Sequence, residues 1–219
     1  MSDRSPDRWL KGLHHLAFFC LALLLPWALQ AQANPPQPGE LPNTVSAPSL
    51  TEGDKFAYRV VQSLGLRGFA GAAIGASIGQ ARNSPSEWGQ GVAGFSKRYG
   101  SGFAGNFSRQ AFAFTLESVF HEDPRYFPSE EKTIKERTLN AAKQVFWTKT
   151  DDGSSEVAYG RLISEFGAAE FTNVWQAHST GKQSSAIIRT CVGLGGDAAY
   201  NFMQEFIPFT RPRSLRHQH

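Results

Sequence analysis

Residues 187–206, IIRTCVGLGGDAAYNFMQEF, contain the clearest helical pattern in the chain. Small and apolar side chains recur there in steps of three or four residues, at Ile187, Cys191, Gly195, Ala198, Phe202 and Phe206. Such a stripe lies along one face of an α-helix, and Pro208 ends the segment. We therefore predict an amphipathic helix whose stripe faces the core, with Cys191 as a buried small hydrophobic residue.

Two helix starts are recognisable earlier in the chain. Thr51-Glu-Gly-Asp54 resembles a capping box, and Ser84-Pro85-Ser86-Glu87 places serine, proline and glutamate at the N-cap, first and third helical positions. After the second start, an apolar stripe runs from Val92 to Phe114. Six glycines between residues 89 and 105 weaken this segment, so the helix either breaks near Gly100 or has a packing reason to keep them.

Two more helices are expected before the last one. Ser129 begins a helix that runs to about Phe146, and Ser154 begins a helix from Glu156 to about Trp175, after a turn at residues 151–153. Together these segments predict an all-α fold, a compact bundle of about five helices rich in Gly, Ala and Phe. A β-barrel is less consistent with the sequence, because only residues 110–120 approach the alternation that a barrel strand needs.

Three glycines form a row within one of these helices, at Gly71, Gly75 and Gly79. On a helix this spacing lets another backbone approach closely, and in membranes it is an association motif. Only 14 uncharged residues separate Arg67 from Arg82, which suits a packed helix better than a membrane span. We predict close packing against the 187–206 helix, with membrane insertion and a non-helical loop as the alternatives.

The first 33 residues have the three parts of a secretory signal peptide. Arg4, Arg8 and Lys11 form a basic region, an apolar run follows to Leu25, and Ala31-Gln-Ala33 is a cleavage motif. We predict a signal peptide over 1–33, a disordered Pro-rich linker over 34–50, a helical domain over 51–209 and a basic disordered tail over 210–219. The expected location is the periplasm or the cell envelope, and an uncleaved membrane anchor is the alternative.

The composition excludes several classes of protein. The chain has 219 residues, 41% of them hydrophobic, with 22 Lys+Arg against 19 Asp+Glu. These values exclude an acidic disordered chain, a disulfide mini-protein, a coiled-coil rod and a bundle of long apolar membrane spans. The near-balanced charge gives no reason to expect nucleic acid as a partner.

One stretch concentrates polar residues, His121-Glu122-Asp123-Pro124-Arg125-Tyr126-Phe127. His121, Glu122 and Asp123 are groups that bind a divalent cation or act as acid and base, with Arg125 or Tyr126 assisting. Adjacent residues point to different faces of a helix, however, and no second histidine stands at metal-ligand spacing. The alternative is a helix end in which Asp123-Pro124 makes a turn and Arg125 pairs with a nearby acid. We therefore predict neither a metal nor a cofactor.

Several short stretches together resemble a family of uncharacterised, predicted-exported proteins of acidobacteria and related soil bacteria. They are residues 87–91, 97–100, 121–127, 158–161 and 205–208, and the resemblance covers about residues 55–210. It implies no activity, cofactor or catalytic residue, and it implies only that the 121–127 cluster is a family signature.

The function expected from these features is that of an exported, non-catalytic helical envelope protein with a structural, partner-binding or membrane-associated role. Its partner would be another envelope protein or the membrane surface, and its oligomeric state is left open. The alternative is a small periplasmic hydrolase or metal-dependent enzyme that uses His121, Glu122 and Asp123. No nucleophile, metal-ligand spacing or phosphate loop in the chain has the context that its chemistry needs.

Overall fold

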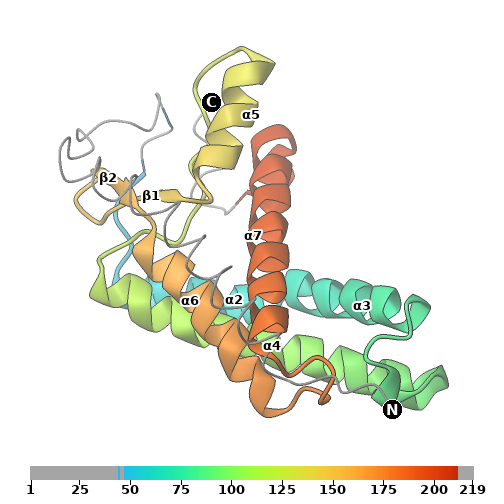
Figure 1. Cartoon of the computed structure of the whole chain (residues 1–219). Coiled ribbons are helices and arrows are strands. Elements are labelled where there is room, and N and C mark those ends of the chain that lie inside the picture. The colour runs from blue at the N-terminus through green and yellow to red at the C-terminus, as the bar shows by residue number, and fades with distance from the viewer. Residues whose placement is uncertain (1–43, 45–46, 212–219) are drawn as a thin grey trace, which may run out of the picture. The chain divides into compact units, whose positions relative to one another are not determined.

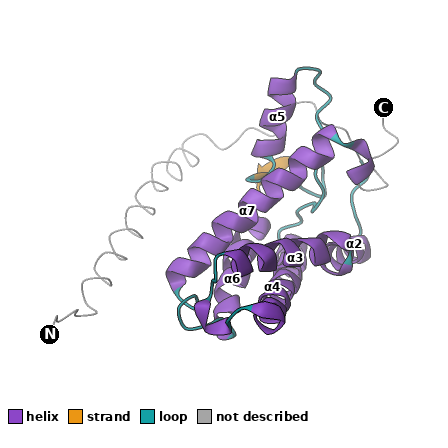
Figure 2. Ribbon diagram, turned by 90° about the vertical axis from the view of Figure 1, so that its right-hand side faces the viewer, coloured by secondary structure: helices purple, strands orange, loops and turns teal. Residues whose placement is uncertain are grey.

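The structure, a computed structural model, describes residue 44 and residues 47–211 (Figures 1 and 2). The α-helices of this part are α2 (Glu52–Leu64), α3 (Leu66–Ala81), α4 (Gly91–Val119), α5 (Ile134–Lys143), α6 (Tyr159–Phe171) and α7 (Gln183–Phe206). Short 3₁₀ turns lie at Ser86–Trp88, Thr172–Val174 and Pro208–Thr210. The predicted all-α fold is confirmed, and the predicted signal peptide lies outside the described residues.

The central element is α4. Helices α2, α3 and α6 pack against it, and α7 packs against α6 and α5. Figure 1 shows α6 crossing in front of α4, with α7 rising beside it towards α5. Helices α2 and α4, from the first half of the chain, and α6 and α7, from the second half, therefore surround a common region.

The helix starts are partly as predicted. The capping box at Thr51 is confirmed, because Thr51 Oγ1 accepts from the backbone N of Asp54 at 3.2 Å and the Asp54 carboxylate accepts from Thr51 N. The start predicted at Ser84 is wrong, since a 3₁₀ turn intervenes and α4 begins at Gly91. The helix predicted from Ser129 begins later, at Ile134.

The helix predicted from Glu156 is preceded by a hairpin. Strands β1 (Trp147–Lys149) and β2 (Ser155–Val157) pair antiparallel, with Trp147 opposite Val157, and α6 starts only at Tyr159. Between the strands, Asp152 Oδ1 accepts from Ser154 N at 2.9 Å, and Gly153 takes a positive φ of 85° that favours glycine. The predicted turn at 151–153 is thus the hairpin turn.

Helix α4 continues through Gly100, and α3 and α6 pack along it. A Cβ added at Gly102 would lie 3.7 Å from the Cα of Ala72 in α3, and one at Gly105 would lie 3.5 Å from Thr172 Oγ1, which are ordinary contact distances. A Cβ added at Gly100 would meet no atom within 4 Å. The structure therefore accommodates a methyl group at these three positions, and tertiary contacts keep the helix continuous despite the low helix propensity of glycine.

The glycine row in α3 is placed differently from the prediction. An added Cβ at Gly71 or Gly75 meets no atom within 4 Å, and both residues are exposed. The packed face of α3 is instead formed by Ala72 and Ala76, which are buried. The prediction that Gly75 packs against the 187–206 helix is therefore wrong.

Burial in the helices is the reverse of what the apolar stripes predict. In α7 the buried residues are Ala186 and four polar residues, Asp197, Asn201, Gln204 and Glu205. The predicted core stripe faces outward there, and Cys191 is exposed rather than buried. In α4 the buried face includes Arg98, Gln110 and Glu117, while Val92 and Phe107 are exposed.

Residues on both sides of the predicted helical domain contact it. Arg211, assigned to the basic tail, is buried and donates to the carbonyl oxygens of Gln204 at 2.7 Å and Glu205 at 3.0 Å. In the predicted linker, the carbonyl oxygen of Pro48 accepts from Arg125 Nη2 at 2.6 Å, and Thr44 bridges to Ser129. The remaining residues of the predicted linker and tail lie outside the described part.

Candidate functional site

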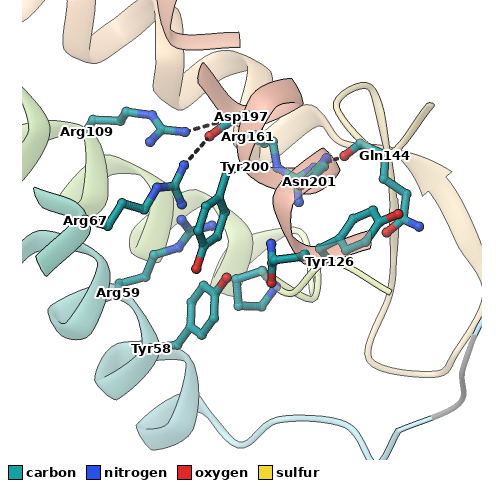
Figure 3. Close-up of a pocket in the computed structure, with 12 residues that line it drawn as sticks. Tyr58, Arg59, Arg67, Arg109, Tyr126, Gln144, Arg161, Asp197, Tyr200 and Asn201 are labelled. Carbon is teal, nitrogen blue, oxygen red and sulfur yellow. Dashed lines mark hydrogen bonds and ion pairs between the residues drawn. The ribbon is translucent and has the colours of Figure 1, made fainter. Parts of the chain in front are cut away.

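A polar cavity lies where the helices meet (Figure 3). It holds about 380 Å³ of empty space, including the part that is open to solvent. Helices α2, α3, α4, α6 and α7, the loop after α4 and the end of α5 each contribute a side chain to its wall. These residues are Tyr58, Arg59, Arg67, Arg109, Pro124, Tyr126, Gln144, Arg161, Asp197, Tyr200, Asn201 and Gln204.

One carboxylate joins two of the arginines in the wall. Asp197 Oδ1 accepts from Arg67 Nη2 at 3.0 Å, and Asp197 Oδ2 accepts from Arg109 Nη2 at 2.6 Å. The guanidinium of Arg67 also lies over the ring of Tyr200, 3.8 Å from its centroid. Asp197 thereby connects α7 to α3 and α4, as the dashed lines in Figure 3 show.

Two further carboxylates, those of Glu117 and Glu165, pair with Arg59 and Arg109 of the wall. Arg59 Nε donates to Glu117 Oε2 at 2.8 Å, and its Nη1 donates to Gln110 Oε1 at 2.9 Å. Arg109 pairs through its Nε with Glu165 of α6. These ion pairs fix the guanidinium groups of α2 and α4 in the wall, because each charge has a partner in a buried setting.

The pKa of Asp197 reports the charge around the cavity. Burial acts to raise the pKa of its carboxyl, but the four guanidinium groups, Arg109 foremost, outweigh burial and hold the pKa below its ordinary value. For Glu165, by contrast, burial is the larger effect and raises the pKa despite the pairing with Arg109. The four guanidinium groups thus favour the ionised form of Asp197.

The fourth arginine is bound differently. Arg161 is buried, and its Nη1 donates to the carbonyl oxygen of Gln144, the residue that ends α5. Within the described part of the chain Arg161 makes no ion pair with a carboxylate. Nearby, Gln204 is 1% exposed and its Oε1 has no hydrogen-bond partner among the described residues.

A second polar cluster supports the cavity from the side of α5. Glu205 of α7 accepts from the hydroxyl of Tyr126, from Ser129 N at 3.1 Å and from Arg137 Nε at 2.7 Å. Asn140 Nδ2 donates to the Tyr126 hydroxyl at 2.9 Å. These bonds hold the loop after α4 and helix α5 against α7, and they fix the position of Tyr126 in the wall.

The residues predicted as a site from the 121–127 cluster are separated in the structure. His121 is exposed, with its Nδ1 3.7 Å from Asp151 Oδ2. Glu122 is buried at the start of α6, where Oε1 accepts from Gly160 N at 2.7 Å, and burial raises the pKa of its carboxyl to about 7. Asp123 pairs with Arg125, whose Nη2 lies 2.6 Å from Asp123 Oδ2. Only Tyr126 reaches the cavity.

The contacts of four of these five residues, all except His121, stabilise the local structure. Glu122 caps α6, the Asp123–Arg125 pair orders the loop, and Tyr126 bonds Glu205. In residues 44 and 47–211, no group of three His, Cys, Asp or Glu residues has an arrangement that could hold a metal ion. The hydrolase or metal-enzyme alternative stays a prediction that no contact of His121 favours.

The arginines and Asp197 of the cavity were not predicted from the sequence. Some of them stand in runs that are otherwise uncharged, such as Arg67 in α3 and Asp197 within residues 190–204. Burying an ionised side chain is costly unless it is paired, so a charge in such a run signals a partner elsewhere in the fold. The identity of that partner depends on tertiary contacts, which helical periodicity does not contain.

Comparison with known proteins adds no family assignment. No family model, curated protein or solved structure matches the chain. None of the described helices combines the length and the apolar character needed to cross a membrane.

Proposed function

We propose that this protein is an exported, non-catalytic helical protein of the cell envelope whose outer surface contacts the acyl chains of a membrane. The observation that carries the proposal is a broad surface without exposed charge. It comprises α3, α4 from Arg98 onward, α6 and α7, and we call it the apolar band. Every charged residue of these segments is buried or half-buried, namely Arg67, Arg98, Arg109, Glu117, Arg161, Glu165, Glu170, Arg189, Asp197 and Glu205.

Large hydrophobic side chains fill the apolar band. Leu66 and Ile74 of α3 are 85% and 62% exposed, and Val192 of α7 is 69% exposed. Others are Phe69 and Ile78 on α3, Phe107, Phe112 and Val119 on α4, Ile163, Phe166 and Phe171 on α6, and Ile187, Ile188, Met203 and Phe206 on α7. Surfaces that face water normally mix such residues with roughly 25–35% charged ones. Exposure of so many apolar side chains to water is unfavourable in free energy, and an apolar environment around the band avoids that cost.

The exposed charges lie at the margins of the apolar band. One group surrounds the start of α4, with Arg82, Glu87 and Lys97, and Ser179 N donates to Glu87 Oε1 at 2.9 Å to bring the α6–α7 connection there. The other exposed charged residues lie at the start of α2, after the end of α4, on α5, in the hairpin and at Lys182, directly before α7. Since α4 has 29 residues and is about 43 Å long, the two ends of this helix are far apart.

Lipid fits the apolar band better than a protein partner does. A typical protein interface covers one face, about 800 Å² per partner. The band instead includes four helices that pack against one another in sequence, with exposed apolar residues on each. The interior is polar and largely satisfied by ion pairs, as polar groups must be when water does not reach them.

Flotation of membranes after an alkaline carbonate wash tests the proposal. The parent protein should rise with the lipid, and Ile74→Lys/Ile78→Lys should shift to the soluble or aggregated fraction. Each lysine placed in hydrocarbon costs about 2–3 kcal/mol. The matched control is Ser96→Lys/Thr133→Lys, which adds the same charge at exposed polar positions outside the apolar band and should float like the parent.

Two results would contradict membrane contact. One is a parent protein that stays soluble without detergent and does not float. The other is an Ile74→Lys/Ile78→Lys variant that floats as completely as the control. A detergent-free parent that elutes as a defined oligomer would favour a second protein copy as the cover of the apolar band.

A further inference from the structure

The cavity between the helices has more hydrogen-bond donors and positive charge than its own acceptors use. Four guanidinium groups line it, those of Arg59, Arg67, Arg109 and Arg161. The carboxylates paired with them are Glu117, Asp197 and Glu165. Arg161 is the one of the four that has no carboxylate within ion-pair distance among the described residues. The carboxyl nearest to the backbone of Arg161, Glu122, already serves the start of α6.

Unused polar atoms of other elements face the same cavity. The hydroxyl groups of Tyr58 and Tyr200 make no hydrogen bond to a described residue, and both residues line the cavity. Gln204 is 1% exposed with an unpartnered Oε1, so its side-chain amide is buried without its full set of bonds. A buried polar group without a partner is costly, so such a group in a cavity indicates a molecule that completes it.

We propose that this cavity binds the phosphate group of a small anion, either a free phosphate or the phosphodiester of a lipid headgroup. Arg161 pairs with the phosphate, and the hydroxyls of Tyr58 and Tyr200 donate to it. Gln204 Oε1 is an acceptor, so it takes a proton from a water or a hydroxyl group that accompanies the phosphate. A guanidinium group matches phosphate oxygens in bidentate geometry. This inference depends on the cavity alone and does not require the membrane contact proposed above.

The shape of the site favours phosphate over a carboxylate. The donors come from α2, α6 and α7, so they approach the centre from several directions. A tetrahedral phosphate presents oxygens in several directions, whereas a carboxylate presents two oxygens in one plane. The cavity is small and partly open to solvent, so it suits a compact group.

Titration calorimetry of the purified protein tests the site with two probes. Inorganic phosphate, compared with chloride at equal ionic strength, represents the free anion, and short-chain phosphatidylglycerol represents the headgroup. We expect the parent to bind at least one probe with one site per chain. Arg161→Gln should weaken binding about tenfold or more, because it removes a charged hydrogen-bond donor. Arg82→Gln, which removes an exposed arginine outside the cavity, should bind like the parent.

A second variant keeps the test decisive if Arg161→Gln does not fold. Gln204→Glu is nearly isosteric and brings a negative charge into the cavity, so it should also abolish binding. Binding of phosphatidylglycerol alone identifies a headgroup as the ligand, and binding of inorganic phosphate identifies a free anion. The proposal is overturned if the parent binds neither probe, or if Arg161→Gln or Gln204→Glu binds as tightly as the parent.

Discussion

Glycine serves two opposite purposes in this chain, and single substitutions separate them. At Gly75 an added Cβ meets no atom within 4 Å, so this glycine has no packing role in the described structure. At Gly160 an added Cβ would lie 3.0 Å from the backbone N of Glu117 and 3.1 Å from the carbonyl carbon of Leu116. Gly160 therefore lets the start of α6 lie directly on α4. The local sequence around each glycine does not reveal this difference.

Gly75→Ala and Gly160→Ala should shift the melting temperature in opposite directions. Gly75→Ala should stabilise α3 by about 1 kcal/mol, because alanine is the better helix former. Gly160→Ala should cost about 1–3 kcal/mol, because the added methyl group forces α6 away from α4. Thermal melts of both variants in one detergent measure the effect. A Gly75→Ala variant that melts well below the parent would mean that α3 packs against something at this position.

Buried ion pairs join several helices of this fold. Helices α2 and α4 meet through Arg59 and Glu117, both less than 10% exposed. Helix α7 meets α3 and α4 through Asp197, and it meets α5 through Glu205 and Arg137. A buried pair of this kind fixes geometry more than it adds stability, since its attraction is offset by the loss of hydration.

Removal of one charge of the Arg59–Glu117 pair should therefore lower the free energy of unfolding more than removal of both charges. Glu117→Leu leaves the charge of Arg59 buried and unpaired, which should cost about 3–5 kcal/mol. The double variant Arg59→Met/Glu117→Leu removes both charges and should recover most of that loss. Chemical denaturation of the two variants and the parent measures the difference. A double variant no more stable than Glu117→Leu would show that the pair contributes a net attraction not explained by desolvation.

The all-α class and some helix ends follow from the sequence, whereas several helix starts do not. The capping box at Thr51 and the end of α7 before Pro208 depend on neighbouring residues, so they could be read from the chain. The α6 start at Tyr159 depends on pairing between β1 and β2, which local signals near Ser154 do not contain. The continuity of α4 through Gly100 likewise depends on tertiary contacts, because α3 and α6 pack along this helix.

The candidate site followed much less from the sequence. An apolar stripe predicts a helix equally well whether it faces a protein core or a lipid, because the period is the same. We assigned the stripes of α4 and α7 to the core, and the structure places polar residues there instead. Arg109, Arg161 and Asp197 come together only in the folded chain, whereas the dense cluster at residues 121–127 is visible in sequence and separates on folding.

For the molecule as a whole, the central claim is that the apolar band contacts acyl chains, and Cys191 offers a direct probe of it. Cys191 is exposed on α7 beside Val192, and the only other cysteine of the chain is Cys20 in the predicted signal peptide. A nitroxide attached at Cys191, with Cys20→Ser where the leader is kept, reports collisions with oxygen, which concentrates in lipid, and with a water-soluble nickel chelate. Ser179→Cys in a Cys191→Ser background is the control at the charged margin.

Electron paramagnetic resonance of the labelled protein in phosphatidylglycerol-containing vesicles decides the question. The account predicts high accessibility to oxygen and low accessibility to the nickel chelate at Cys191, with the reverse order at Ser179→Cys. High accessibility to the nickel chelate at Cys191 would show that the apolar band faces water, and low accessibility to both reagents would show that another protein covers it. Either result would contradict lipid contact.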